Sequence, residues 1–193
     1  LGVHAIHVPF AGAWEVGVWI IPIFAFAVVA TGNAVNITDG LDGLAGGLAS
    51  SAFFAYAVIA ILDQQFGLAG FCFTMLGALV SYLWFNIYPA RFFMGDVGAF
   101  ALGCSLAVVA MLTDTLFVLP LIGLVFVMET LSVIIQLTSK RIRHKKIFKS
   151  APVHHHLEAS GWPETKVTMR FWLIGAVCAV AGLIFAIVGG CIK

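Results

Sequence analysis

Two asparagines and two aspartates stand close together in one short segment of the sequence. They are Asn33, Asn36, Asp39 and Asp42, and a glycine follows each aspartate. Carboxylate and amide oxygens are hard ligands that suit Mg²⁺, which usually keeps water and substrate phosphate oxygens in its shell. Glycine permits a tight turn at such positions. An Asx turn with helix caps is the simpler alternative, but four such side chains with glycines between them favour a ligand site.

A second segment places aromatic rings beside a carboxylate. Phe92 and Phe93 come shortly before Asp96, which has a glycine just before it and another two positions after it. Asp96 begins a predicted helix, where negative charge is favourable, so an ordinary N-cap is one interpretation. The rings could stack on a planar group next to the charge, or anchor the chain at a membrane interface. A membrane face shared with Asp39 and Asp42 would favour a joint site.

Three consecutive histidines, His154, His155 and His156, form the third polar group. Adjacent side chains on a helix point in different directions, so a zinc site made of all three is not favoured. Imidazole can instead hydrogen-bond phosphate or carboxylate, and a solvated loop is the simpler alternative. Six lysines and arginines between positions 140 and 149 precede the histidines. Such a run is typical of a topology signal with affinity for anionic lipid headgroups; binding of a phosphorylated substrate is a second interpretation.

Glu129 lies inside an otherwise apolar segment. Ser132 and Gln136 follow it at helical spacing, so the three side chains share one face. An intramembrane carboxylate usually faces the interior of a helix bundle or a water-filled cavity. The sequence leaves two roles open for Glu129, one in the lining of a substrate groove and one as a buried structural group.

The composition places these motifs in a membrane protein. Of the 193 residues, 62% are apolar and 10% are charged, and the mean hydropathy is +1.07. About a quarter of the residues of a soluble domain are usually charged, so a soluble enzyme and a disordered segment are both disfavoured. The net charge of +1 gives no general signal for polyanion binding, which argues against a nucleic-acid binder.

Long apolar runs predict an all-α fold, a polytopic membrane helix bundle in a single domain. A span needs about 20 apolar residues, and unbroken runs favour helices over the alternating strands of a β-barrel. We predict about six spans, at 16–32, 44–62, 66–88, 97–113, 115–138 and 167–190.

The distribution of lysine and arginine predicts the orientation. With six crossings, the loops 33–43, 89–96 and 139–166 share one side, and nine of the ten basic residues lie in or beside them. Positively charged loops stay in the cytoplasm, so the three polar motifs are predicted at the cytoplasmic face. The four cysteines show no Cys-x-x-Cys spacing and indicate neither a zinc site nor a disulfide framework.

In their order along the chain, the motifs resemble those of the polyprenyl-phosphate N-acetylhexosamine-1-phosphate transferases, most closely the phospho-N-acetylmuramoyl-pentapeptide (MraY-type) transferases. The resemblance rests on Asn33-Ala-Val-Asn-Ile-Thr-Asp-Gly-Leu-Asp-Gly-Leu-Ala, Phe93-Met-Gly-Asp-Val-Gly98 and Ala151-Pro-Val-His-His-His-Leu-Glu158. It implies a reaction between UDP-N-acetylmuramoyl-pentapeptide and undecaprenyl phosphate. The products would be lipid I and UMP, formed with Mg²⁺ at the cytoplasmic face of the bacterial inner membrane in peptidoglycan synthesis.

The resemblance also implies roles for the acidic and amide side chains. Asp96 and Asp42 would be the catalytic carboxylates. Asp96 would bind Mg²⁺, with Asn36 as a second ligand. The nucleotide and diphosphate would lie against Asn33, Asp39 and Asp42.

Further roles follow for the aromatic and imidazole groups. Phe93 would stack on uracil. The polar groups of the substrate would contact His154, His155 and His156. The lipid tail would lie along a groove near Glu129.

Two features depart from the family pattern. The family carries an adjacent Asp-Asp pair in an earlier cytoplasmic loop, and no Asp-Asp occurs in this sequence. The family also has roughly ten spans, so the six predicted here would correspond to its carboxyl-terminal part. The alternatives are a related N-acetylglucosamine-1-phosphate transferase, an inactive fragment, and a transporter with a broken-helix ion site. A homodimer is a further expectation.

Overall fold

Long apolar helices make up most of the structure, a computed structural model in which residues 5–192 are described. In chain order the elements are β1 (Ala5–Val8), β2 (Gly12–Glu15), a 3-10 turn (Gly17–Trp19), α1 (Ile20–Thr38), α2 (Leu44–Leu62), α3 (Phe66–Asn86), α4 (Gly95–Leu112), α5 (Leu119–Ile122), α6 (Leu124–Arg143), α7 (Val153–Glu158) and α8 (Glu164–Val188). Within the described residues, five helices, α1, α2, α3, α4 and α8, are long and apolar enough to cross a membrane. The prediction of an all-α, multi-pass membrane protein is confirmed.

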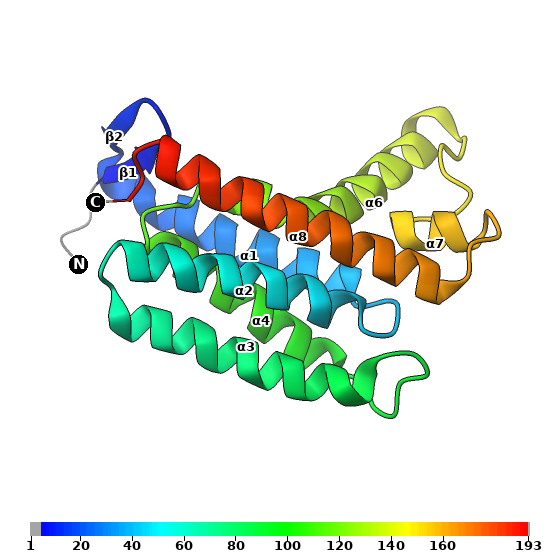
Figure 1. Cartoon of the computed structure of the whole chain (residues 1–193). Helices are drawn as coiled ribbons and strands as arrows, with labels where there is room; N and C mark the ends of the chain where they lie inside the picture. Colours follow the sequence, from blue (N-terminus) through cyan, green and yellow to red (C-terminus); the bar gives the residue numbers. More distant parts are fainter. Residues whose placement is uncertain (1–4, 193) are drawn as a thin grey trace.

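The fifth predicted span, 115–138, differs from the helices that the structure contains. Pro120 lies in the first turn of α5, a position that suits its fixed φ and missing N–H. α5 ends at Ile122, and Gly123 separates it from α6. α6 contains Glu129 and three basic residues in its last turn, and it leans away from the other helices (Figure 1). Residues 5–192 therefore contain five long apolar helices, whereas about six spans were expected.

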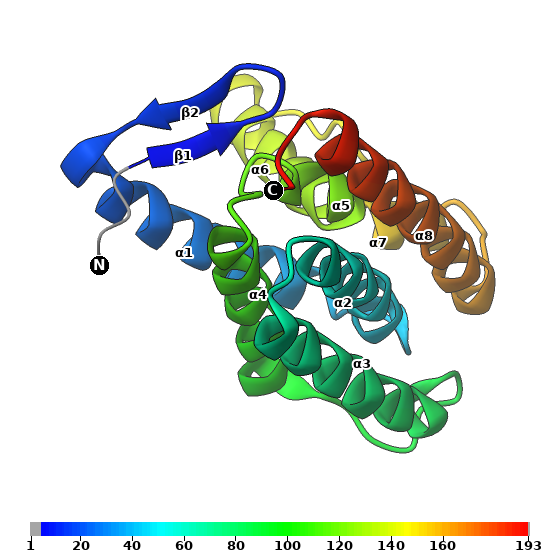
Figure 2. The same cartoon turned by 60° about the vertical axis from the view of Figure 1, so that its left-hand side comes forward.

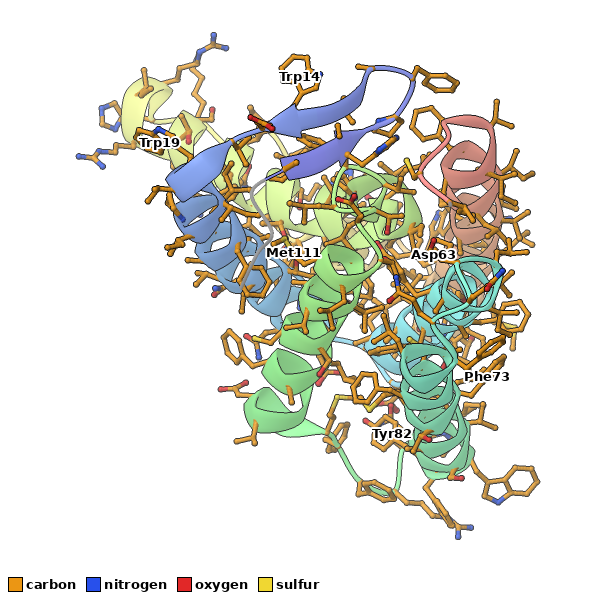
Figure 3. The ribbon with its side chains drawn as sticks, turned by 90° about the vertical axis from the view of Figure 1, so that its left-hand side faces the viewer. Trp14, Trp19, Asp63, Phe73, Tyr82 and Met111 are labelled. Atoms are coloured by element: carbon orange, nitrogen blue, oxygen red, sulfur yellow. The ribbon has the colours of Figure 1, made fainter. Side chains whose placement is uncertain are left out.

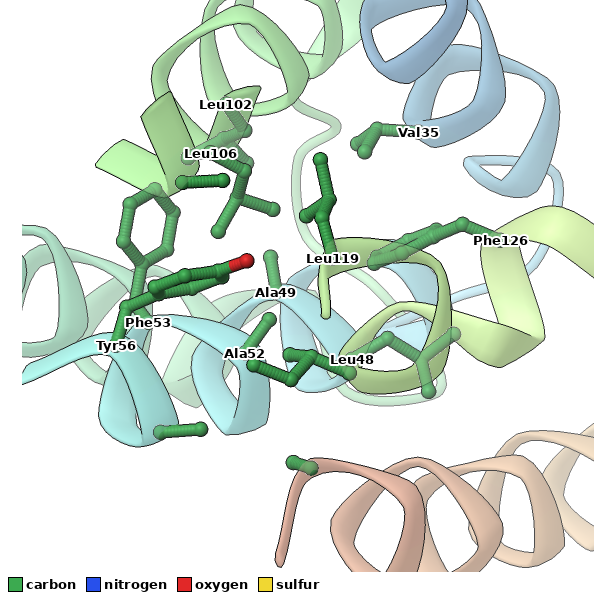
Figure 4. Packing of buried hydrophobic residues seen from close by; sticks show 14 of the residues in the cluster. Val35, Leu48, Ala49, Ala52, Phe53, Tyr56, Leu102, Leu106, Leu119 and Phe126 are labelled. Atoms are coloured by element: carbon green, nitrogen blue, oxygen red, sulfur yellow. The ribbon is translucent and has the colours of Figure 1, made fainter. Parts of the chain in front are cut away.

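α2 forms the centre of the bundle. In its most apolar stretch 72% of the residues are buried, against 22–39% in the corresponding stretches of α1, α3, α4 and α8. The reason is that these four helices all contact α2. Alanines along α2 allow this close approach, and Phe53 and Tyr56 are fully buried on it. Figure 4 shows these two side chains facing Leu102 and Leu106 of α4, with Leu119 of α5 nearby. The core is therefore built around α2.

α1 and α4 cross at a pair of glycines. A Cβ atom on Gly103 would lie 2.5 Å from the carbonyl oxygen of Thr31 and 2.7 Å from Cα of Gly32, so the two backbones touch there. Gly32 comes about one turn before Asn36, and Gly103 comes about two turns after Asp96. This crossing therefore sets the separation of two side chains that the sequence singles out.

We expect Gly103→Ala to destabilise the protein by about 1–3 kcal/mol, because a backbone contact cannot be relieved by rotating a side chain. Thermal unfolding of the purified protein in detergent measures the effect. The matched control is Gly77→Ala on α3, whose Cβ would meet no described atom within 4 Å and whose helical position favours alanine. Equal unfolding midpoints for the two variants would contradict the close crossing of α1 and α4.

The connections gather at the two ends of the bundle (Figure 1). The loop end, as we call it, carries the turn 39–43, the loop 87–94 and the segment 144–163. The opposite end carries the antiparallel β1–β2 hairpin beside the end of α8 (Figure 2). No strand was predicted there; the hairpin packs on α8 through Phe10 and Phe185, whose ring centroids are 5.2 Å apart. Trp14 and Trp19 are exposed at this end (Figure 3), as is common at a membrane interface.

Candidate active site

A hydrogen bond between α1 and α4 joins the first two polar motifs. Nδ2 of Asn36 donates to Oδ1 of Asp96 at 3.0 Å, across 60 positions of sequence. Met94 is the N-cap of α4, and Asp96 lies in the first turn after it. The carboxylate is therefore not the helix cap that the sequence left as an alternative. It is exposed at the loop end, where a ligand can reach it.

Asp39 follows the last residue of α1 and adds a second carboxyl group to this pair. Burial raises the pKa of Asp39 above its ordinary value, and the negative charge of Asp96 raises it further. Two carboxylates that repel each other beside an amide oxygen form a site where a cation would be stabilised. The structure thus brings Asn36, Asp39 and Asp96 together at one end of the bundle.

The raised pKa of Asp39 predicts a pH dependence of stability. A carboxyl group with a raised pKa stabilises the fold while it is protonated, and this contribution is lost as pH rises through the folded-state pKa. We expect Asp39→Asn to raise the unfolding midpoint of the metal-free protein at neutral pH and to weaken its decline with pH. Thermal unfolding between acidic and neutral pH measures this, and parallel pH curves for the two proteins would contradict the raised pKa of Asp39.

Asp42 ties three segments together at the loop end. Its Oδ2 accepts the backbone N–H of Ala90 at 2.9 Å, which joins the turn 39–43 to the loop 87–94. Its own backbone N–H donates to Oε1 of Glu164 at 2.7 Å, at the start of α8. A small pocket of about 40 Å³ lies beside it, with Tyr88 and Trp172 among its lining residues. Asp42 therefore has a clear positioning role in addition to any chemical one.

Asn86 is a residue that sequence reasoning missed as a site member. It is buried at the end of α3, where its Oδ1 accepts the N–H of Gly43 at 3.0 Å and its Nδ2 donates to the carbonyl of Phe92 at 2.9 Å. Trp172 on α8 donates from Nε1 to the carbonyl of Gly43 at 3.0 Å. An amide at the end of an apolar span was the available signal, since such a group needs partners at that depth.

The two phenylalanines of the second motif differ in exposure and contacts. Phe92 packs its ring against Tyr82 and Phe85, with centroids 5.4 and 5.8 Å apart. Phe93 is 72% exposed, so it is the ring that can stack on a ligand. Asn33 is also exposed, and its amide donates to the carbonyl of Val29 in its own helix at 2.7 Å.

The three histidines of α7 have different hydrogen-bond partners, although the rings of His154 and His155 lie next to each other, with centroids 4.2 Å apart. His154 is fully buried against Glu129, whereas Nδ1 of His155 lies 2.7 Å from a carboxylate oxygen of Glu158. Nδ1 of His156 accepts the backbone N–H of Lys149 at 3.1 Å. Between residues 5 and 192, no group of three or more His, Cys, Asp or Glu side chains is placed to hold a metal ion.

The polar stripe on α6 faces inward and organises the segment that follows it. Gln136 is buried; its Oε1 accepts the backbone N–H groups of Ile147 and Phe148, each at 3.0 Å. Glu129 is fully buried and bonded to His154. Of the two roles left open for Glu129, the structure shows a buried and hydrogen-bonded group.

An apolar cavity of about 450 Å³ lies between α1, α5 and α6. Residues on α6 that line it include Phe126, Thr130 and Ile134, which flank Glu129 along the helix without placing its carboxylate in the cavity. The lining is almost entirely apolar, so the cavity suits a hydrocarbon chain better than a polar ligand.

A comparison with known protein families shows which family the chain belongs to. The model of glycosyl transferase family 4 matches residues 1–114, more than half of the chain. The chain belongs to glycosyl transferase family 4. The part matched to this family contains Asn36, Asp39, Asp42, Phe93 and Asp96, and the histidine motif lies beyond it.

Individual glycosyl transferase family 4 relatives are similar over almost all of the chain. A phospho-N-acetylmuramoyl-pentapeptide-transferase of Chloroflexus aurantiacus is 48% identical, over 96% of this chain and 53% of its own length. Enzymes of the same name from Levilactobacillus brevis and Bacillus thuringiensis are 46% and 47% identical, over 93% and 88% of this chain and 55% and 52% of their own lengths. The chain thus spans about half the length of the curated relatives it matches, and the resemblance predicted from its motifs is confirmed.

Proposed function

We propose that the chain contributes to a membrane phosphotransferase that moves phospho-N-acetylmuramoyl-pentapeptide from UDP-N-acetylmuramoyl-pentapeptide to undecaprenyl phosphate. The products are lipid I and UMP, as in peptidoglycan synthesis. The observation that carries the proposal is the Asn36–Asp96 hydrogen bond beside Asp39, a cluster of hard oxygen ligands at one end of a membrane bundle. Two relatives that are 48% and 46% identical to this chain are named phospho-N-acetylmuramoyl-pentapeptide-transferase.

The reaction brings two anions together. An oxygen of the lipid phosphate bonds to the β-phosphorus of the UDP conjugate, the bond from that phosphorus to the bridging oxygen breaks, and UMP leaves with that oxygen. The chemistry that a bound Mg²⁺ supplies here is neutralisation of charge between the two phosphates. Asp96 and Asn36 would hold the ion with Asp39 nearby, a donor set of carboxylate and amide oxygens that fits Mg²⁺.

Residues around this cluster would orient the UDP conjugate. Phe93 offers an exposed ring for uracil. Asn33, which precedes Asn36 in the sequence, and Asp42, which follows Asp39, provide further polar groups. His155 and His156, both half-buried on α7, would contact polar groups of the sugar or peptide. Asp42 and Asp96 are the two carboxylates we assign to catalysis.

The apolar cavity beside α6 would hold part of the prenyl tail. Its volume of about 450 Å³ is large enough for only a segment of a long hydrocarbon chain. Thr130 and Leu131 of α6 line it, and Glu129 is not among its lining residues. The tail is therefore proposed next to α6 but not in contact with the carboxylate of Glu129.

The positively charged segment after α6 suggests the membrane orientation. Six exposed basic residues between positions 140 and 149 lie at the same end as the acidic cluster, and such charge stays in the cytoplasm. We propose a bacterial inner-membrane location with this end in the cytoplasm, and a single transmembrane domain. The family's Asp-Asp pair is absent from the sequence, so turnover is proposed to need residues that this chain does not supply. A homodimer stays a prediction.

The complete enzyme, meaning this chain with the additional part that its relatives carry, tests the substrate assignment. UMP release is measured with undecaprenyl phosphate and either UDP-N-acetylmuramoyl-pentapeptide or UDP-N-acetylglucosamine. We expect release with the first sugar nucleotide alone. Release with UDP-N-acetylglucosamine alone would replace the assignment by the related N-acetylglucosamine-1-phosphate transfer.

Phe93→Ala is expected to raise the KM for the UDP conjugate roughly tenfold, because stacking of one base on an aromatic ring contributes about 1–3 kcal/mol. The unfolding midpoint should change little, since Phe93 is 72% exposed. Phe92→Ala is the matched control: its ring packs on Tyr82 and Phe85, so it should lower the midpoint more than it raises KM. An unchanged KM for Phe93→Ala would remove this ring from the nucleotide site.

A further inference from the structure

A fully buried contact between a histidine and a carboxylate joins α6 to α7. Nδ1 of His154 lies 3.0 Å from Oε2 of Glu129, and the backbone N–H of His154 donates to Oε1 of the same carboxylate at 3.2 Å. Both side chains are essentially inaccessible to solvent, at 1% and 0% exposed. One carboxylate therefore holds both the backbone and the ring of the first histidine in the motif.

The geometry defines where the imidazole proton lies. A carboxylate only accepts hydrogen bonds, so Nδ1 of His154 must carry a proton to bond Glu129. Nε2 of His154 is buried and has no hydrogen-bond partner among residues 5–192. A second proton there would be an unpaired buried donor, which is costly. The surroundings thus favour a neutral ring with the proton on Nδ1 and a bare Nε2.

The bare Nε2 faces the acidic turn. A Cβ atom on Gly40 would lie 2.5 Å from Nε2 and 3.1 Å from Cε1 of His154. Gly40 is not among the residues with positive φ, so its backbone conformation is open to any residue. The imidazole is what excludes a side chain at this position. Gly40 directly follows Asp39, and the ring lies against the turn that carries Asp39 and Asp42.

We propose that Glu129 and His154 are positioning residues for the acidic turn 39–43. Glu129 fixes the orientation of the imidazole, and the imidazole sets how far the turn can move toward α7, and hence where Asp39 lies relative to Asp96. The proposal rests on the proposed function for the meaning of that placement. It gives the intramembrane carboxylate and the buried histidine a common role that is separate from contact with substrate or lipid.

The segment that supplies His154 is itself held in place. Gln136 anchors the backbone at Ile147 and Phe148, and Ser139 donates to the carbonyl of Lys145 at 2.9 Å. These hydrogen bonds connect α6 at several points to the segment that leads to α7. A shift of α6 would therefore be transmitted through His154 to the acidic turn, which is the property a positioning residue needs.

The first test is a nuclear magnetic resonance measurement of the histidine tautomers of this chain, labelled with ¹⁵N-histidine in detergent. His154→Gln identifies the resonances that belong to His154. We expect a neutral ring protonated on Nδ1, and we expect Glu129→Gln to move the proton to Nε2, because the glutamine amide can donate to Nδ1. A wild-type ring protonated on Nε2, or on both nitrogens, overturns the proposal. This test needs no turnover.

The second test separates positioning from simple packing. In the complete enzyme, Glu129→Gln should lower kcat at least tenfold and raise the Mg²⁺ concentration needed for half-maximal rate, with little change in the unfolding midpoint. Ser132→Ala is the matched control, because its hydroxyl donates only within α6, to the carbonyl of Glu129 at 2.6 Å, and it should leave both values unchanged. A tautomer change without a change in rate or Mg²⁺ requirement overturns the positioning role.

A steric cycle gives a result that does not depend on the proposed function. Gly40→Ala should lower the unfolding midpoint in the wild-type background and much less in a His154→Ala background, where the ring is absent. Equal shifts in the two backgrounds overturn the contact. If the wild-type enzyme releases no UMP, the proposed function fails, and the tautomer measurement and this cycle still decide whether Glu129 and His154 hold the turn.

Discussion

Asp96→Asn is expected to lower Mg²⁺-dependent UMP release by the complete enzyme about a hundredfold or more, the scale seen when one electrostatic stabiliser of a transition state is removed. The variant loses the charge that would bind the ion. The fold should remain intact, because an asparagine oxygen can still accept the 3.0 Å hydrogen bond from Asn36. The assay compares UMP release by wild type and variant over a range of Mg²⁺ concentrations.

Glu15→Gln provides the control for the loss of a carboxylate. Glu15 is exposed on β2 at the opposite end of the bundle, so its removal should not change UMP release. If Asp96→Asn kept wild-type turnover and the same Mg²⁺ requirement, Asp96 would have no role as a metal ligand.

Asp42→Asn should also reduce turnover by about a hundredfold, because it removes the negative charge of the carboxylate. This chemical effect can be separated from the structural role of Asp42. The asparagine oxygen can still accept the N–H of Ala90, so the tie between the turn 39–43 and the loop 87–94 is kept. Asp42→Ala removes this tie as well and should cost a further 1–3 kcal/mol or so in stability, since the N–H of Ala90 loses its partner. Turnover and unfolding midpoints are measured on both variants.

The comparison of the two variants identifies the role of Asp42. Loss of turnover in both, with loss of stability in Asp42→Ala alone, supports a chemical role for the carboxylate. Normal turnover in Asp42→Asn would leave Asp42 with the positioning role that its contacts to Ala90 and Glu164 show.

Continuous apolar segments were the most predictable part of the fold. The span expected at 44–62 coincides with α2 (Leu44–Leu62), because this helix is apolar all around and ends at polar or glycine-rich turns. The span expected at 115–138 is instead divided into α5 and α6, which are separated by Gly123, and Pro120 lies in the first turn of α5. A hydropathy average over about 20 residues does not detect such a break, because the apolar residues around Pro120 and Gly123 dominate the average.

The β1–β2 hairpin shows the opposite limitation. Each strand has four residues, and the pairing of Ala5 with Glu15 and Val8 with Gly12 is too short to produce a clear alternation in the sequence. Its position depends on packing against α8 through Phe10. Such tertiary contacts cannot be inferred from the hairpin residues alone.

Residue types and spacing indicated a ligand site, but they did not say which side chains would meet. The family resemblance implied that Asn36 and Asp96 act together, whereas the 3.0 Å distance between them depends on the crossing of α1 and α4 at Gly32 and Gly103. The bond between Glu129 and His154 likewise depends on how α7 folds back onto α6. Helical spacing predicts which residues of one helix share a face, but it does not predict which residues of another helix they contact.

The most direct test of the central claim is the Mg²⁺ dependence of UMP release from UDP-N-acetylmuramoyl-pentapeptide and undecaprenyl phosphate by the complete enzyme. We predict release that needs Mg²⁺, stops when a chelator is added, and returns when Mg²⁺ is restored. Release that continues at full rate in the chelator, or no release from a folded and complete enzyme in the presence of Mg²⁺, would contradict the assignment of the loop end as a metal-dependent phosphotransfer site.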